Sequence, residues 1–302
     1  PQSYPQAMTG FALLCFLAHN DTPESPEFGM TVLRSMQYLT SFVLSTDRPV
    51  DKGYGHAIVT YALADAYTLT KLPALKAPME KGLQMIVDGQ QPDGGWDYNY
   101  AQGERWDLSV SAWQIQALKS GYLARAEVEG LEEAMDKAVR FVRKTTFENG
   151  RFGYSAPGSG SPGMQGAGTL VLQILGEYDS REAKTGAENI IENHQMVWDD
   201  AAKYALHRHP SYDWYYQTQA VYHASKHDFV KWFRRCVPTL VLRQYPDGHW
   251  ECPGKDSEVG AVDPYYSTCL NALTLQVYTR YLPSYEAPKK MARTEINILD
   301  LD

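Results

Sequence analysis

The chain of 302 residues carries a formal net charge of −8, and its pI lies near 5.5. It shows no basic stripe, so nucleic acid is not an expected partner, and no run of eighteen apolar residues, so no membrane span is expected. Association with a membrane surface stays open. Because the sequence begins at Pro1 without Met, a removed leader would not be seen, and the compartment is undetermined.

Six segments of the chain are apolar on nearly every face. A helix with so wide an apolar stripe is buried, as the segment over 54–69 illustrates with Val59 and Leu63. In chain order, the six predicted helices start near Pro5, Gly53, Asp107, Gly163, Tyr212 and Asp263. Helices with one charged face alternate with them, for example over 131–143, where Glu132 lies.

A repeated skeleton marks the ends of the charged helices. Over 81–96 it reads basic, small, two apolar residues, Gln, Gly and an aromatic at fixed spacing, and it returns without gaps over 235–250. A weaker copy covers 137–152, and a degenerate one is expected near Trp198. Because Pro and Gly break the helix at the turn, we expect the Gln to bond the free backbone groups there. The aromatic is expected to fold back onto the helix.

Six helical pairs with a period of about fifty residues predict an all-α fold, a single (α/α)6 toroid with an outer ring of helices around an inner one. An open superhelix is the alternative, because the sequence does not show closure. The toroid domain is predicted over 1–285. Residues 286–302 have mixed charge and no apolar period, and they are predicted to form an extended tail that crosses the ring.

The skeletons over 81–96 and 235–250 resemble the Gln-Trp motif of squalene-hopene cyclases and related prenyltransferase/squalene-oxidase repeat proteins. Segments 54–57, 107–114 and 212–218 are similar to uncharacterised bacterial members of that family. The resemblance covers roughly residues 5 to 285. It implies an α/α toroid whose central cavity collects residues from the starts of the inner helices, and it implies chemistry on isoprenoids.

In triterpene cyclases of this family, an Asp-x-Asp-Asp motif supplies the proton that starts cyclisation. This sequence has no such motif, and its nearest approach is the segment 198–200. Prenyltransferases of this fold hold zinc with Asp, Cys and His in set places. Here Cys269 follows Asp263 by six residues, which does not match that arrangement.

Three aspartates, Asp107, Asp213 and Asp263, recur at or near the predicted starts of buried helices. Such residues cap helices by accepting hydrogen bonds from free backbone N–H groups. The alternative is a ring of carboxylates at one mouth of a cavity, where an apolar surrounding would favour the protonated form that an acid catalyst needs. Both roles can coexist at one residue.

Aromatic side chains accompany these aspartates, in a chain with 21 Tyr and 7 Trp. Core packing is the ordinary role of aromatics on buried helices, and a structural role is the ordinary one for a histidine there. The alternative is a cavity lining that stabilises a carbocation by cation–π attraction. The candidate lining residues are Tyr54, His56, Trp106, Trp113, Trp214, Tyr215, Tyr265 and Tyr266.

No metal or cofactor is expected. The spacing of His194, His207 and His209 fits no zinc pattern, and Arg208 between two of them would repel a cation. The Gly-rich segment over 155–163 lacks the spacing of a phosphate-binding loop.

Three functions fit these observations. The first is an enzyme that processes an isoprenoid or another apolar ligand in the toroid, and the second is a binding or scaffold protein whose cavity holds a small molecule or a partner segment. The third is a carbohydrate-active enzyme with paired carboxylates and stacking aromatics. The lining separates them: apolar walls favour isoprenoids, polar rims favour sugars, and a cavity filled by Tyr and Trp favours a scaffold.

Overall fold

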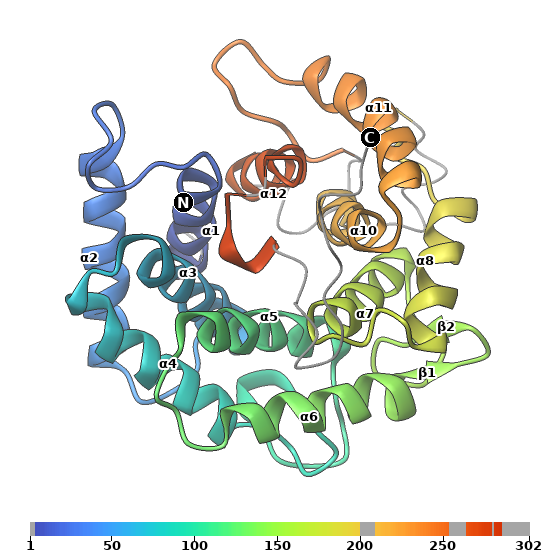
Figure 1. The fold of residues 1–302 in the computed structure, drawn as a ribbon, viewed down its shortest axis with the longest axis horizontal. Helices are drawn as coiled ribbons and strands as arrows, with labels where there is room; N and C mark the ends of the chain where they lie inside the picture. The colour runs from blue at the N-terminus through green and yellow to red at the C-terminus, as the bar shows by residue number, and fades with distance from the viewer. Residues whose placement is uncertain (1–3, 200–208, 254–263, 280, 286–302) are drawn as a thin grey trace, which may run out of the picture.

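The computed structural model describes residues 4–199, 209–253, 264–279 and 281–285. Within these ranges eleven α-helices form two concentric rings (Figure 1). The inner ring contains α1 (Pro5–Ala18), α3 (Tyr54–Thr70), α5 (Leu108–Ala124), α7 (Pro162–Ile174), α10 (Pro210–Ala224) and α12 (Pro264–Gln276). The outer ring contains α2 (Gly29–Ser45), α4 (Lys76–Asp88), α6 (Leu131–Phe141), α8 (Arg181–Asn193) and α11 (Lys226–Val241).

The inner ring is closed. Each inner helix packs on the next, and α12 packs on both α10 and α1. At the α1–α12 junction, the Cys15 Sγ lies 3.3 Å from the Cys269 carbonyl oxygen, and Gln276 Nε2 donates to the Cys15 carbonyl at 3.0 Å. The (α/α)6 toroid predicted from the repeat is therefore confirmed, and the open superhelix is excluded. The tail expected over 286–302 lies outside the described residues.

Local sequence explains where the inner helices begin. Four of the six, α1, α7, α10 and α12, start with proline, whose fixed φ suits the first helical position and whose missing N–H has no partner there anyway. Helix α5 instead begins after Asp107, which caps it. The predicted start positions agree with the observed ones to within two residues.

The repeated spacing of the Gln-Trp skeleton has a packing explanation. After α4, Gln90 Nε2 donates to the Gly94 carbonyl across the turn at 3.0 Å, and Trp96 folds back so that its Nε1 donates to the Ile86 carbonyl at 2.8 Å. Gly94 has a φ of 98°, a positive value that glycine adopts more readily than any residue with a side chain. The same pair of bonds follows α11, at 2.9 Å and 2.8 Å. The skeleton thus closes the end of an outer helix against its own turn.

The weaker copy after α6 departs from this arrangement. Its last turn is a π-helical turn, η4 (Val142–Thr146), and a short antiparallel hairpin follows, β1 (Phe147–Glu148) with β2 (Arg151–Phe152). The aromatic position, Phe152, is nevertheless fully buried, as Trp96 is. The packing role of the aromatic is therefore kept without the indole hydrogen bond.

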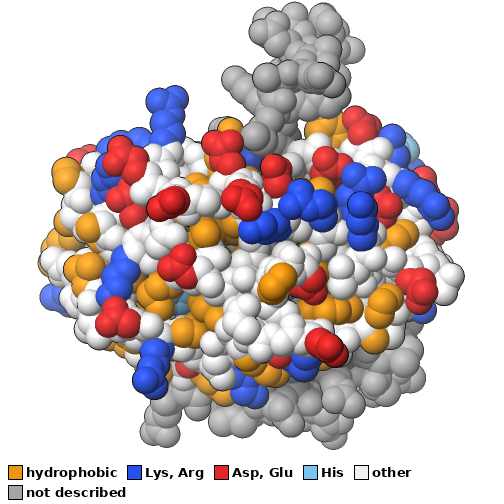
Figure 2. All heavy atoms as spheres, turned by 90° about the horizontal axis from the view of Figure 1, so that it is seen from below, with side chains coloured by type: hydrophobic (Ala, Val, Ile, Leu, Met, Phe, Trp, Pro, Cys, Tyr) orange, Lys and Arg blue, Asp and Glu red, His pale blue; other side chains and the backbone are white. Residues whose placement is uncertain are grey.

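The outer surface is mixed in character. Figure 2 shows the side where α6 lies, with acidic, basic and apolar side chains interspersed. Ion pairs on this layer include Lys137 with Glu133 at 2.9 Å. Among the described residues, no helix combines the length and apolar character that crossing a membrane needs.

Candidate functional site

The middle of the inner ring is filled with aromatic side chains. Trp113 of α5 stacks on Tyr215 of α10 with ring centroids 5.4 Å apart, and it meets Phe11 of α1 edge-on at 5.2 Å. Tyr266 lies 5.8 Å from Phe11 on the far side. Gln116 links the two neighbouring α10 phenols by accepting from one and donating to the other, at 3.0 Å and 2.9 Å. The structure thus brings Trp113, Tyr215 and Tyr266 together in one cluster.

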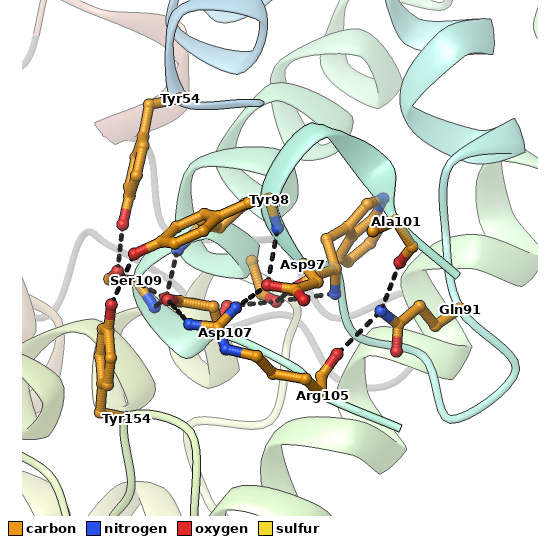
Figure 3. Close-up of polar contacts among 12 residues, drawn as sticks. Tyr54, Gln91, Asp97, Tyr98, Ala101, Arg105, Asp107, Ser109 and Tyr154 are labelled. Carbon is orange, nitrogen blue, oxygen red and sulfur yellow. Dashed lines mark hydrogen bonds and ion pairs between the residues drawn. The ribbon is translucent and has the colours of Figure 1, made fainter. Parts of the chain in front are cut away.

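The end of the ring where α3 and α5 begin carries a polar cluster, which we call the mouth cluster (Figure 3). Its members come from four stretches of the chain, 51–54, 97–98, 105–109 and 154. The first stretch joins the cluster because η1 (Asp51–Gly53) packs on η3 (Tyr98–Tyr100). The members are Asp51, Lys52, Tyr54, Asp97, Tyr98, Arg105, Asp107, Ser109 and Tyr154.

Asp107 sits at the base of the mouth cluster with the contacts of a helix cap. Its Oδ1 accepts from Ser109 N at 2.9 Å, from Ser109 Oγ at 2.6 Å and from Val110 N at 3.1 Å. Its Oδ2 pairs with Arg105 at 3.2 Å. The side chain is fully buried, so both oxygens are engaged with protein donors.

Half-buried phenols cover Asp107. The Tyr54 hydroxyl lies 2.5 Å from Ser109 Oγ, and the Tyr98 and Tyr154 hydroxyls lie 2.7 Å apart. Burial raises the pKa of Tyr54, and the negative charge of Asp107 adds to that rise. Burial likewise raises the pKa of Tyr154, so Tyr54 and Tyr154 are neutral hydrogen-bonding groups.

Arg105 connects the mouth cluster to the loop before it. Its guanidinium pairs with Asp97 and with Asp107, and it lies 4.6 Å from the centroid of the Tyr98 ring. Asp97 in turn accepts from Tyr98 N at 2.7 Å. Lys52 approaches the same ring at 5.2 Å. The Tyr98 ring is thus held between charged groups at the rim of the toroid.

Asp51 is the mouth-cluster carboxylate with an unused oxygen. Burial raises its pKa, and its Oδ2 is shielded from solvent without a hydrogen-bond partner in the structure. Residues 51–53 all have positive φ, with Asp51 at 53° and Lys52 at 58°. Such conformations cost free energy in non-glycine residues and concentrate at functional sites.

Other predicted site residues lie elsewhere. Trp106 packs edge-on against Phe141 of α6 at 5.5 Å, between the rings, and Trp214 lies 5.7 Å from Trp198. Asp213 is buried in the first turn of α10, four residues into the helix, with its carboxylate against Gly163.

The remaining predicted residues are His56, Tyr265 and Asp263. His56 Nε2 lies 3.0 Å from the Gly82 carbonyl of α4, and burial lowers its pKa to about 4, so the ring is neutral near pH 7. Tyr265 is 40% exposed, and Asp263 lies outside the described residues. Of the predicted residues that the structure describes, Tyr54 and Asp107 belong to the mouth cluster.

Comparison with known proteins identifies the fold. It resembles the GH76A alpha-1,6-mannanase of Salegentibacter sp., with a TM-score of 0.62, 12% identity, and coverage of 90% of this chain and 88% of that one. It also resembles the glycoside hydrolase family 76 (mannosidase) of Bacteroides thetaiotaomicron, with a TM-score of 0.61, 12% identity, and coverage of 90% and 86%. No family model and no curated protein sequence matches the chain.

The predicted membership of the prenyltransferase/squalene-oxidase repeat family is therefore wrong, and so is its description as a terpenoid cyclase or squalene-hopene cyclase relative. The toroid's structural neighbours are glycoside hydrolases. The physical reason lies in the skeleton itself, whose Gln90 and Trp96 close a helix turn. That contact closes a turn at the end of an outer helix and carries no information about the reaction.

Sequence reasoning missed most of the mouth cluster. Asp51, Tyr98, Arg105 and Tyr154 lie in connecting segments, so no helical period marks them. Two signals were available: the Asp-Lys-Gly run before α3, and the Tyr-Asn-Tyr run between Trp96 and α5. In the part of the chain that the structure describes, no group of three His, Cys, Asp or Glu side chains could hold a metal ion.

Proposed function

We propose that this chain binds a carbohydrate at the mouth cluster. The observation that carries the proposal is the half-buried Tyr98 ring beside a guanidinium, a carboxylate and two further phenol hydroxyls. Sugars combine C–H faces, which pack on aromatic rings, with hydroxyls that bond planar charged groups. An aromatic surface with a few fixed polar groups is the usual form of a small-molecule site.

The filled interior argues for a surface site rather than for an isoprenoid enclosed in the ring. Trp113, Tyr215 and Phe11 are at most 2% exposed, and they occupy the space an apolar ligand would need. The fold shared with mannan-degrading enzymes favours the carbohydrate among the remaining alternatives, although a fold alone does not fix a function.

Binding of soluble α-1,6-linked mannan, measured by isothermal titration calorimetry beside a panel of other glycans, tests the proposal. Removing a stacking ring, as in Tyr98→Ala, is expected to abolish binding, whereas Tyr38→Ala on the exposed face of α2 serves as the matched control. Equal binding by both variants, or no glycan bound by the wild type, would refute the proposal and favour a scaffold.

Hydrolysis is a second candidate function, favoured by Asp51. A glycosidase needs a carboxylic acid that keeps its proton to protonate the leaving oxygen, and burial raises the pKa of such a group. Asp51 has that environment and an oxygen without a partner. If Asp51 is this acid, Asp51→Asn stops release of reducing ends from mannan, while mannan still binds through the Tyr98 ring. An unchanged rate would exclude the role.

A further inference from the structure

The residues that follow α12 enter the ring. Residues 282–285, which include η5 (Pro283–Tyr285), pack on α3 and α5 and form the red segment at the centre of Figure 1. Leu282 is 0% exposed and Tyr285 1%. We call residues 282–285 the latch segment. Its depth of burial equals that of the inner helices, although it forms less than two turns of structure.

Asp65 is the main polar anchor of the latch segment. Ser284 Oγ donates to Asp65 Oδ2 at 2.8 Å, and the Tyr61 hydroxyl lies 2.6 Å from the same Oγ. On the other side, Ser120 Oγ donates to Asp65 Oδ1 at 2.9 Å. One fully buried carboxyl therefore ties the latch segment to both α3 and α5.

The groups around this carboxyl leave its charge uncompensated. The titratable neighbours of Asp65 and the latch segment are Tyr61 of α3, Tyr215 of α10, Tyr285 of η5 and Cys15 of α1. Burial raises the pKa of each phenol, and a hydrogen bond with Cys269 together with burial raises that of the thiol, so all four are neutral near pH 7. Lys119, the one basic residue of α5, lies over the Tyr122 ring, 5.7 Å from its centroid, and does not pair with Asp65. In the described parts of the chain, no cation pairs with Asp65.

The sign of the resulting pH dependence follows from burial. Desolvation raises the pKa of Asp65 from 3.8 to about 7, and this outweighs the hydrogen bonds from Ser284 and Ser120, which favour the charged form. The closed state therefore holds the proton more tightly than an opened, hydrated state. The free energy that holds the latch segment closed is therefore greatest below about pH 4. It falls as the pH rises toward 7 and changes little above that.

We propose that residues 282–285 act as a pH-sensitive latch, seated on Asp65, which covers the inner faces of α3 and α5 when Asp65 is protonated and loosens when Asp65 ionises. Opening hydrates the carboxylate and exposes the inner faces of α3 and α5. The latch lies on the ring axis and shares no residue with the mouth cluster, so it stands independently of carbohydrate binding.

Hydrogen exchange of the latch segment, measured by mass spectrometry and corrected for the intrinsic pH dependence of exchange, tests the latch. The opening equilibrium of the wild type is expected to rise roughly 10- to 50-fold from pH 5 to pH 7 and then to level off. Asp65→Asn removes this rise, whereas Asp136→Asn on the exposed face of α6 keeps it. No corrected pH dependence in the wild type, or a full one in Asp65→Asn, would overturn the proposal.

A second variant covers the case in which Asp65→Asn fails to fold. Ser284→Ala removes the direct contact with Asp65 and leaves the carboxyl in place. Because Ser284 Oγ contacts both Asp65 and the Tyr61 hydroxyl, the variant should raise the opening of residues 282–285 at pH 5 roughly 5- to 30-fold, the equivalent of one to two lost hydrogen bonds. Exchange in α3 should be unchanged. Unchanged exchange in the latch segment would refute the latch, and so would equal deprotection of α3, because the contact would then be part of the global fold.

Discussion

Replacing Asp107 measures how much its helix cap contributes to the free energy of unfolding. In Asp107→Ala, helix α5 loses its cap, which costs about 1 kcal/mol. The buried Ser109 hydroxyl loses its acceptor, for about 1 kcal/mol more, and the pair with the partly exposed Arg105 adds less than about 1 kcal/mol. We therefore expect the free energy of unfolding to fall by about 2 to 3 kcal/mol.

Urea denaturation of the wild type, Asp107→Ala and Asp107→Asn measures this loss as a shift of the midpoint at constant m-value. Asn keeps an oxygen that can accept the bonds made by Oδ1, so its cost should be about 1 kcal/mol or less. An Ala variant within about 0.5 kcal/mol of the wild type would refute the capping account. An Asn variant as unstable as Ala would show that the charge, and not the cap, is what matters.

Three further predictions follow from buried contacts. Trp96→Phe leaves the Ile86 carbonyl without its donor and should cost about 1 to 3 kcal/mol in urea denaturation; an unchanged midpoint would contradict the packing role of the skeleton. His56 has a pKa lowered to about 4, so its contribution is complete above pH 6.5 and is lost toward pH 4, by about 3 kcal/mol. The difference in unfolding free energy between wild type and His56→Gln should shrink over that range, and a constant difference would argue against it. Gly55→Ala places a Cβ against the Asp51 carboxyl, which must then shift, and should lower any mannan hydrolysis; turnover equal to that of the wild type would argue against Asp51 as the acid.

The fold could be predicted because its signals are local and repeated. Each inner helix is apolar nearly all round, and each Gln-Trp turn lies where an outer helix ends. Ring closure did not follow from the pattern, since it depends on contacts such as Cys15 with Cys269, which are 254 residues apart. The predicted family was wrong for a related reason: the repeat encodes a turn at the end of an outer helix, and a turn does not specify a ligand.

The candidate site was only partly predictable. Asp107 and Tyr54 stand at helix starts, where the period places them, and both lie in the mouth cluster. Tyr98 and Tyr154 are 56 residues apart in segments that connect the main helices, and their hydroxyls come into contact only when the ring has formed. The environment of Asp51 likewise depends on the approach of η3 (Tyr98–Tyr100) to η1 (Asp51–Gly53), which no single segment of sequence records.

Hydrogen exchange with and without saturating α-1,6-linked mannan tests directly whether a carbohydrate contacts the mouth cluster. We expect slower exchange over 51–54 and 97–107, with no change in the latch segment or along α6. Protection confined to another surface, or no protection at any site, would contradict it.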